Sequence, residues 1–181
     1  MLPSAPGLHR VQEGMPLPII IVRGSSPGQT LLVSAGVLGD EYGGVRAIFE
    51  TCAALDPTSL SGQLIALPIV NYPAHRACSR THPADGGNLA RAFPGCPGGS
   101  PTERLAWAFA QSFLALADFY LDLHSAGVRF AMPSLVGFEA ADPRGRAAAE
   151  AFGAPVIWGH PVPFFTPKPA VPGASIPTTC S

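Results

Sequence analysis

The sequence has no strong excess of charge of either sign. Only 13% of its 181 residues are charged, and 11 Lys and Arg stand against 12 Asp and Glu, for a formal net charge of −1. A balance of this kind produces no broad positive field that would attract nucleic acid or an acidic membrane. We therefore expect no nucleic-acid partner, and any recognition of charge must be local.

Long apolar runs and closely spaced cysteines are also missing. No run reaches the roughly 18 residues of a membrane span, and the opening segment MLPSAPGLHRVQEGMP has neither a basic leader nor the apolar core of a signal peptide. The four cysteines, Cys52, Cys78, Cys96 and Cys180, form no C-x-x-C pair, which argues against a zinc ribbon or a redox dithiol. These absences predict no membrane partner and a cytoplasmic, reducing location.

Apolar residues are plentiful, and they occur in short runs. The chain is 47% hydrophobic, with a mean hydropathy of +0.26, which supplies enough apolar surface for one sizeable core. We expect a single domain over residues 1–181. Runs rich in β-branched residues and bounded by turns predict buried strands. They lie at residues 17–22, 31–37, 62–70 and 119–125, with further candidates at 133–138 and 155–160.

Helical patterns lie between these strands. Val45, Ile48 and Cys52 recur with helical spacing, a second helix begins near Thr102, and a short one is predicted at residues 143–152. Strands that alternate with helices predict an α/β fold with a mixed, mostly parallel sheet flanked by helices. Ligands of such sheets bind beyond the carboxyl ends of the strands.

Segments that carry polar and charged side chains follow the predicted strands. They are residues 36–44, 76–95 and 122–127. The second belongs to a long stretch, residues 71–100, that is rich in Pro, Gly, Arg and His and has no periodicity. A loop of this length in a compact domain is usually functional. After His160 we predict only loop, with one further strand starting near Ser175–Ile176.

Three of these segments together resemble a known family. They read SAGVLGDEYGGVRAI, VNYPAHRACSRTHPADGGNLARAFPG and LDLHSAG, and they follow one another between about residues 31 and 127. Their order and spacing resemble those of the succinylglutamate desuccinylase and aspartoacylase family. The resemblance implies a zinc carboxypeptidase-like fold and zinc-dependent hydrolysis of the amide bond of N-acyl amino acids.

The resemblance also implies a metal site with one ligand missing. Glu41 and His124 match two of the family's zinc ligands, whereas Leu38 stands in the position of the third. Catalytic zinc normally uses three protein ligands and one open position for water, and leucine has no lone pair to donate. Two ligands hold zinc poorly, and we do not favour Asp40 as a substitute. Asp122 could orient His124 by a hydrogen bond, but on an alternating strand we expect it only to share a face with His124.

Read without the family motif, the two candidate ligands also have structural interpretations. A glutamate at the start of a helix is usually a surface residue that complements the helix dipole. A histidine at the end of a strand is usually hydrogen-bonded within the structure.

The substrate-binding residues implied by the resemblance are Arg80, Arg91 and Asn88. The planar fork of a guanidinium suits the recognition of a carboxylate, so the predicted ligand is a small carboxylate-bearing N-acyl amino acid. The alternative is that both arginines are solvated loop charges. The family pattern Asn-Leu-Asn-Arg has Ala90 at its third position here, which removes one substrate contact.

No catalytic residue is assigned within residues 1–181. The resemblance places the general-base glutamate in a segment that opens like residues 173–177, so this glutamate and the family's C-terminal region would follow Ser181. We therefore expect the deacylase activity of the family to be impaired in this chain, with its C-terminal part missing. The alternatives are a non-catalytic carboxylate-binding remnant and a truncated, inactive homologue.

Overall fold

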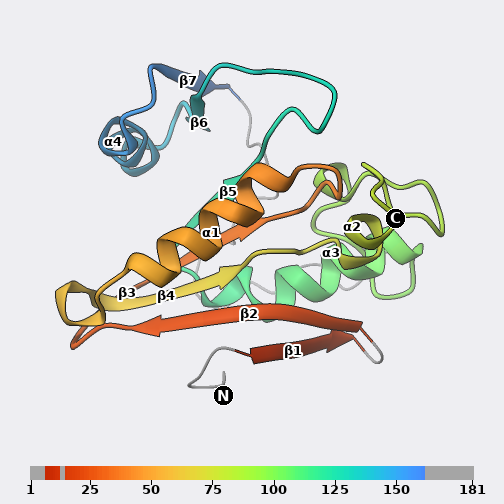
Figure 1. The fold of residues 1–181 in the computed structure, drawn as a ribbon, viewed down its shortest axis with the longest axis horizontal. Helices are drawn as coiled ribbons and strands as arrows, with labels where there is room; N and C mark the ends of the chain where they lie inside the picture. The colour runs from red at the N-terminus through yellow and green to blue at the C-terminus, as the bar shows by residue number, and fades with distance from the viewer. Residues whose placement is uncertain (1–6, 13–14, 162–181) are drawn as a thin grey trace.

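The computed structural model describes residues 7–12 and 15–161, and its centre is a five-stranded sheet with the order β1-β2-β4-β3-β5 (Figure 1). The strands are β1 (Gly7–Gln12), β2 (Met15–Arg23), β3 (Ser26–Ala35), β4 (Ser61–Leu67) and β5 (Phe119–Leu123). The helices around it are α1 (Tyr42–Ala54), α2 (Tyr72–Arg76) and α3 (Pro101–Ser112), with 3₁₀ turns η1 (Pro57–Ser59), η2 (Leu89–Arg91) and η3 (Leu114–Leu116). A separate unit consists of β6 (Leu135–Glu139), α4 (Pro143–Phe152) and β7 (Val156–His160).

Strand direction brings three strand ends to one edge of the sheet. Strand β3 runs parallel to β4 on one side and to β5 on the other, while β2 is antiparallel to both β1 and β4. In this register, Leu32 pairs with both Ile65 and Tyr120. The carboxyl ends of β4, β3 and β5 therefore lie together, as the sequence predicts, and the predicted mixed α/β fold is confirmed.

Two helices cover opposite faces of the sheet, with α1 on one side and α3 on the other (Figure 1). The side chains of β4 alternate between the two layers. Leu64 belongs to the apolar cluster that contains Ile48 of α1, whereas Ile65 belongs to the larger cluster that contains Phe109 of α3. Both faces of the strand are buried, which explains its continuous apolar sequence.

Several element boundaries differ from the sequence-based expectation. Strand β1 was not predicted, because the segment GLHRVQ lacks strict alternation of apolar and polar residues. Strands β3 and β4 end at Ala35 and Leu67, before the predicted Val37 and Val70. The predicted loop at residues 71–100 contains the short helix α2, which begins where the Asn71 side chain accepts a hydrogen bond from the Ala74 amide at 3.3 Å. This local cap leaves no signal in hydrophobic periodicity.

The unit β6–α4–β7 forms a second, two-stranded parallel sheet that lies apart from the five-stranded one (Figure 1). Both strands and the helix are close to their predicted ranges. The prediction of a single sheet is wrong for these strands within residues 7–12 and 15–161, because β6 pairs only with β7 there. The further strand predicted near residues 175–176 lies outside the described residues.

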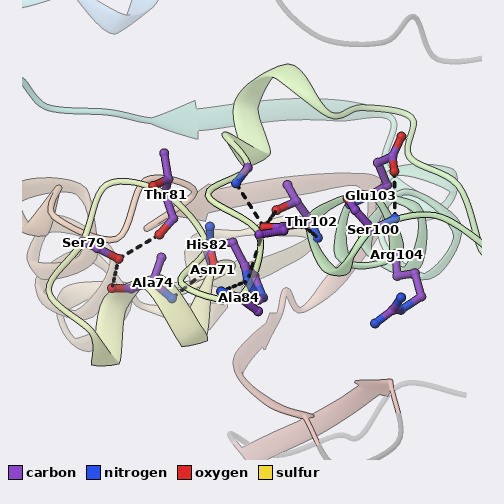
Figure 2. Close-up of polar contacts among 12 residues, drawn as sticks. Asn71, Ala74, Ser79, Thr81, His82, Ala84, Ser100, Thr102, Glu103 and Arg104 are labelled. Atoms are coloured by element: carbon purple, nitrogen blue, oxygen red, sulfur yellow. Dashed lines mark hydrogen bonds and ion pairs between the residues drawn. The ribbon is translucent and has the colours of Figure 1, made fainter.

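A network of polar contacts fixes the long loop against the start of α3 (Figure 2). The Asp85 carboxylate accepts hydrogen bonds from the Thr102 hydroxyl at 2.7 Å, from the Thr102 amide at 2.8 Å and from the Gly87 amide at 3.0 Å. Partial burial opposes ionisation of Asp85, but these hydrogen bonds outweigh it and hold the pKa of the carboxyl well below its ordinary range. Ser100 and Glu103 add a capping box at the helix start.

Replacing Asp85 by alanine should lower the free energy of unfolding by about 1–3 kcal/mol, because the buried Thr102 hydroxyl and amide lose their acceptor. A depressed carboxyl pKa stabilises the fold fully above the ordinary value of about 3.9, and the contribution is lost as the pH falls below it. The loss of unfolding free energy in Asp85→Ala, measured by urea denaturation, should therefore be constant from about pH 7 to pH 5 and smaller near pH 3. Glu139→Ala, at an exposed position, is the control. An equal penalty in both variants would contradict the prediction.

Candidate active site

Three charged side chains converge where the parallel strands end. Glu41 lies in the connection from β3 to α1, His124 directly follows β5, and Arg80 comes from the loop after α2. The sequence separates these residues widely, and the parallel arrangement of β4, β3 and β5 brings them together. Glu41 contacts the other two residues directly.

The Glu41 carboxylate is at the centre of the cluster and is only 3% exposed. Its Oε1 accepts a hydrogen bond from Arg80 Nη1 at 3.0 Å. Its Oε2 lies 2.9 Å from His124 Nδ1 and accepts a second hydrogen bond from the Ser125 amide, also at 2.9 Å. Burial alone would raise the pKa of Glu41, but the contacts with His124, Ser125 and Arg80 together lower it below its ordinary value. The carboxylate is therefore ionised and fully engaged.

His124 lies between two carboxylates. Its Nδ1 faces Glu41, and its Nε2 lies 2.6 Å from Asp122 Oδ2. Ionised carboxylates only accept hydrogen bonds, so both ring nitrogens must carry a proton. Burial opposes this charge, yet the hydrogen bonds that the ring donates to Asp122 and Glu41 outweigh it and raise the pKa of His124 to about 10. The contact with Asp122 goes beyond the expectation that the two side chains merely share a strand face.

Buried Ser34 and partly buried Tyr120, neither of which is predicted as a site residue, hold Asp122 in place. The Ser34 hydroxyl donates to Asp122 Oδ1 at 2.5 Å and lies 2.8 Å from the Tyr120 hydroxyl. Burial and the charge of Asp122 raise the pKa of Tyr120 well above its ordinary value. The period-2 spacing of Tyr120, Asp122 and His124 is the signal that could have grouped them.

Close backbone approaches set the position of Glu41. A Cβ atom at Gly39 would overlap the backbone of Ala74 and His75 in α2. A Cβ at Gly44, in the first turn of α1, would lie 2.8 Å from the Leu123 side chain of β5. Both positions require glycine for lack of space. The start of α1 therefore packs tightly between α2 and β5, next to His124.

Leu38 and Asp40 flank the cluster. Leu38, in the position where the resemblance implies a third metal ligand, is only 4% exposed and belongs to the apolar core. Asp40 Oδ1 is buried and makes no hydrogen bond with the described part of the chain; it lies 3.9 Å from Arg80 Nη1. The Arg80 guanidinium therefore forms its short contact with Glu41 and leaves Asp40 beyond hydrogen-bonding distance.

The other predicted substrate-binding residues lie in and beside η2. Asn88 uses its Oδ1 to cap this turn, accepting a hydrogen bond from the Ala90 amide at 3.0 Å. Arg91, the last residue of the turn, is exposed, and its guanidinium forms no ion pair or hydrogen bond with residues 7–12 or 15–161. In this part of the chain neither residue contacts Glu41 or His124, so the structure joins Arg80 to the cluster and leaves the other two outside it.

Comparison with known proteins identifies the family. Residues 27–164 match the model of the succinylglutamate desuccinylase/aspartoacylase catalytic domain. The chain belongs to this family. The predicted family resemblance is thereby confirmed, and the zinc carboxypeptidase-like fold class is supported by the structural neighbours.

Three relatives show how much of the family's length is present. The chain is 39% identical over 144 residues to the N-alpha-acetyl-L-2,4-diaminobutyric acid deacetylase of Halomonas elongata. The aligned region covers 77% of this chain and 42% of the deacetylase. A succinylglutamate desuccinylase/aspartoacylase from Rhodobacter sphaeroides has a TM-score of 0.72 and 38% identity, over 79% of this chain and 45% of its own. The product-bound ectoine utilization protein EutE (DoeB) of Ruegeria pomeroyi has a TM-score of 0.69 and 35% identity. This match covers 81% of the present chain and 47% of the EutE chain. The chain thus spans less than half of each of these relatives.

The candidate ligands among the described residues do not fit the zinc that the family implies. In the described ranges, no group of three or more His, Cys, Asp and Glu side chains is placed to hold a metal ion. A histidine ligand must present an unprotonated nitrogen, and both nitrogens of His124 are engaged with carboxylates. Leu38 supplies no donor.

No helix in residues 7–12 and 15–161 has the length and apolar character needed to span a membrane.

Replacing Asp122 by asparagine should lower the pKa of His124 clearly below about 10, because the contact with Asp122 is the main interaction that favours the charged ring. A raised histidine pKa stabilises the fold fully below the ordinary value of about 6.5, and this contribution is lost as the pH rises through the folded-state value. The variant should therefore lose less stability than the parent protein between about pH 6.5 and pH 10. NMR titration of the imidazole C–H signal in chelator-treated protein measures the pKa directly. Asp118→Asn, outside the cluster, is the control, and an unshifted His124 titration in Asp122→Asn would contradict the assigned contact.

Proposed function

We propose that this chain provides part of a deacylase-type amidohydrolase for carboxylate-bearing N-acyl amino acids, with carboxylate binding retained and hydrolysis impaired. Family membership and the 39% identity to a deacetylase of N-alpha-acetyl-L-2,4-diaminobutyric acid support the reaction class. The observation that carries the proposal is the state of Glu41, whose two oxygens are both occupied by protein groups while Leu38 is buried beside it.

The proposed ligand contact is a guanidinium–carboxylate pair at Arg91. This side chain is exposed on η2 and has no acidic partner within residues 7–12 and 15–161, so it is available to a ligand. Arg80 is 51% exposed and presents further donors toward solvent while it holds Glu41. Asn88 would contribute its Nδ2, since its Oδ1 is used by the η2 cap.

The impaired step is the activation of water. Hydrolysis of an amide requires a nucleophilic water and a group that moves its proton to the leaving amine. Glu41 is fully hydrogen-bonded and has a lowered pKa, so it is a weak base in this arrangement. The described residues, with buried Leu38 in the place of a donor, also offer no complete zinc site that would supply this activation. The second candidate function, carboxylate binding without turnover, is favoured by the unengaged Arg91 and differs from the first only in hydrolysis.

Arg91→Ala and Arg80→Ala should each weaken the binding of N-alpha-acetyl-L-2,4-diaminobutyrate by about 1.5–3 kcal/mol, which is typical of a hydrogen bond to a charged group. Isothermal titration calorimetry measures the loss, with Arg76→Ala as an exposed arginine control in the same segment. A ligand whose carboxylate is replaced by a carboxamide should bind the parent protein weakly and respond little to Arg91→Ala. Unchanged binding in both arginine variants would show that neither side chain contacts the ligand. Release of acetate by the parent protein then separates impaired hydrolysis from binding alone.

The chain should bind zinc below stoichiometry as purified, and Leu38→His should raise its zinc affinity by at least about tenfold, or roughly 1.4 kcal/mol. The new imidazole would add a third donor beside Glu41 and His124. Leu116→His, at a position that is 48% exposed and away from the cluster, is the matched control. Metal analysis and zinc titration check both statements. Tight stoichiometric zinc in the parent protein would show that another residue has replaced the missing ligand.

A further inference from the structure

We propose that the Arg80 guanidinium is the built-in counter-cation of Glu41 and that it competes with any divalent cation for this carboxylate. The proposal concerns the state of the site without ligand. It holds whether or not the domain binds an N-acyl amino acid, and it assigns Arg80 a role that a substrate-gripping arginine would not have.

Both oxygens of the Glu41 carboxylate are paired with other groups of the protein. A carboxylate that is only 3% exposed must be compensated by the protein. Its Oε2 is occupied by the Ser125 amide and by His124, so Oε1 is the oxygen that an entering cation would reach. Arg80 Nη1 is the hydrogen-bond partner of Oε1, at 3.0 Å. The position of the cation is therefore taken by a side chain of the same chain.

Arg80 approaches Glu41 from the solvent side. Its side chain is 51% exposed, whereas Glu41 is buried, so the guanidinium covers the carboxylate from the solvent side. The same Nη1 atom lies 3.9 Å from Asp40 Oδ1, a buried oxygen with no hydrogen bond to the described residues. One guanidinium thus faces two acidic side chains.

Arg80 and a divalent cation would compete for the same carboxylate, that of Glu41. A divalent cation that reached Glu41 would have to displace a charged hydrogen bond. In return it would gain Glu41 and His124 as protein ligands, because Leu38 offers none and no group of three or more His, Cys, Asp and Glu side chains in the described residues is placed to hold a metal ion. Catalytic zinc sites normally use three protein ligands. The site of this chain therefore favours its own arginine over the metal, which explains the poor fit of the donor set to zinc.

The decisive variant is Arg80→Gln, which keeps hydrogen-bond donors and removes the positive charge. Zinc titrated into the full chain should bind Arg80→Gln roughly tenfold more tightly than the parent protein, the change expected when one charged hydrogen bond no longer competes. In chelator-treated buffer the same variant should melt at least about 4 °C lower, because a buried carboxylate loses one of its two positively charged partners and keeps only His124. Arg76→Gln, at an exposed arginine without an ion pair in the described residues, should change neither quantity.

A second measurement uses the parent protein and does not require that Arg80→Gln folds. Phenylglyoxal modifies accessible guanidinium groups, and peptide mass spectrometry reports the rate at each arginine. Saturating zinc should speed the modification of Arg80, which is displaced from Glu41, and leave Arg76 unchanged. Equal Arg80 rates with and without zinc would overturn the proposal, as would an unchanged or weaker zinc affinity in folded Arg80→Gln. These readouts are separate from the loss of carboxylate binding in Arg91→Ala, so either proposal can fail alone.

Discussion

The carboxylate of Glu41 lies almost entirely out of contact with water, and a charge in such a place must be compensated by neighbouring groups. Three parts of the fold supply this compensation: the loop after α2 through Arg80, the end of β5 through His124, and the backbone amide of Ser125. Each arrives at Glu41 because β4, β3 and β5 are parallel and end at one edge. The sheet therefore determines where the charges meet, and the charges in turn fix the path of the loops that leave it.

The charge network extends into the core beyond the residues that contact Glu41. Asp122 binds the far side of the His124 ring and is itself held by Ser34, which is fully buried between β4 and β5. Polar groups at this depth are tolerated only when their hydrogen bonds are satisfied. The comparisons establish the family, and the described residues of this chain combine a buried Leu38 with a Glu41 carboxylate whose two oxygens are both paired.

The sequence predicts the framework of this fold better than the contacts at its site. The central strands and α1 carry strong apolar patterns, so their existence follows from periodicity, although their ends differ by a few residues. Strand β1 and helix α2 depend on pairing and on a local cap, which leave little apolar signal. At the site, the motifs suggest Glu41 and His124, but the partner of Arg80 depends on the path of a loop. Residue type alone could not show that this arginine pairs with Glu41 while Arg91 remains without an acidic partner in the described chain.

The wide spacing of the charged residues along the chain also bears on how the protein folds. The Arg80–Glu41 contact joins residues 39 positions apart, and the His124–Glu41 contact joins residues 83 positions apart. The pairing of β3 with β5 closes a loop of similar size to that of the His124–Glu41 contact, because Leu31 of β3 pairs with Phe119 of β5. Loop closure costs chain entropy, so forming either of these two sets of contacts lowers the cost of forming the other. The charged cluster and the β3–β5 edge of the sheet are therefore coupled in folding.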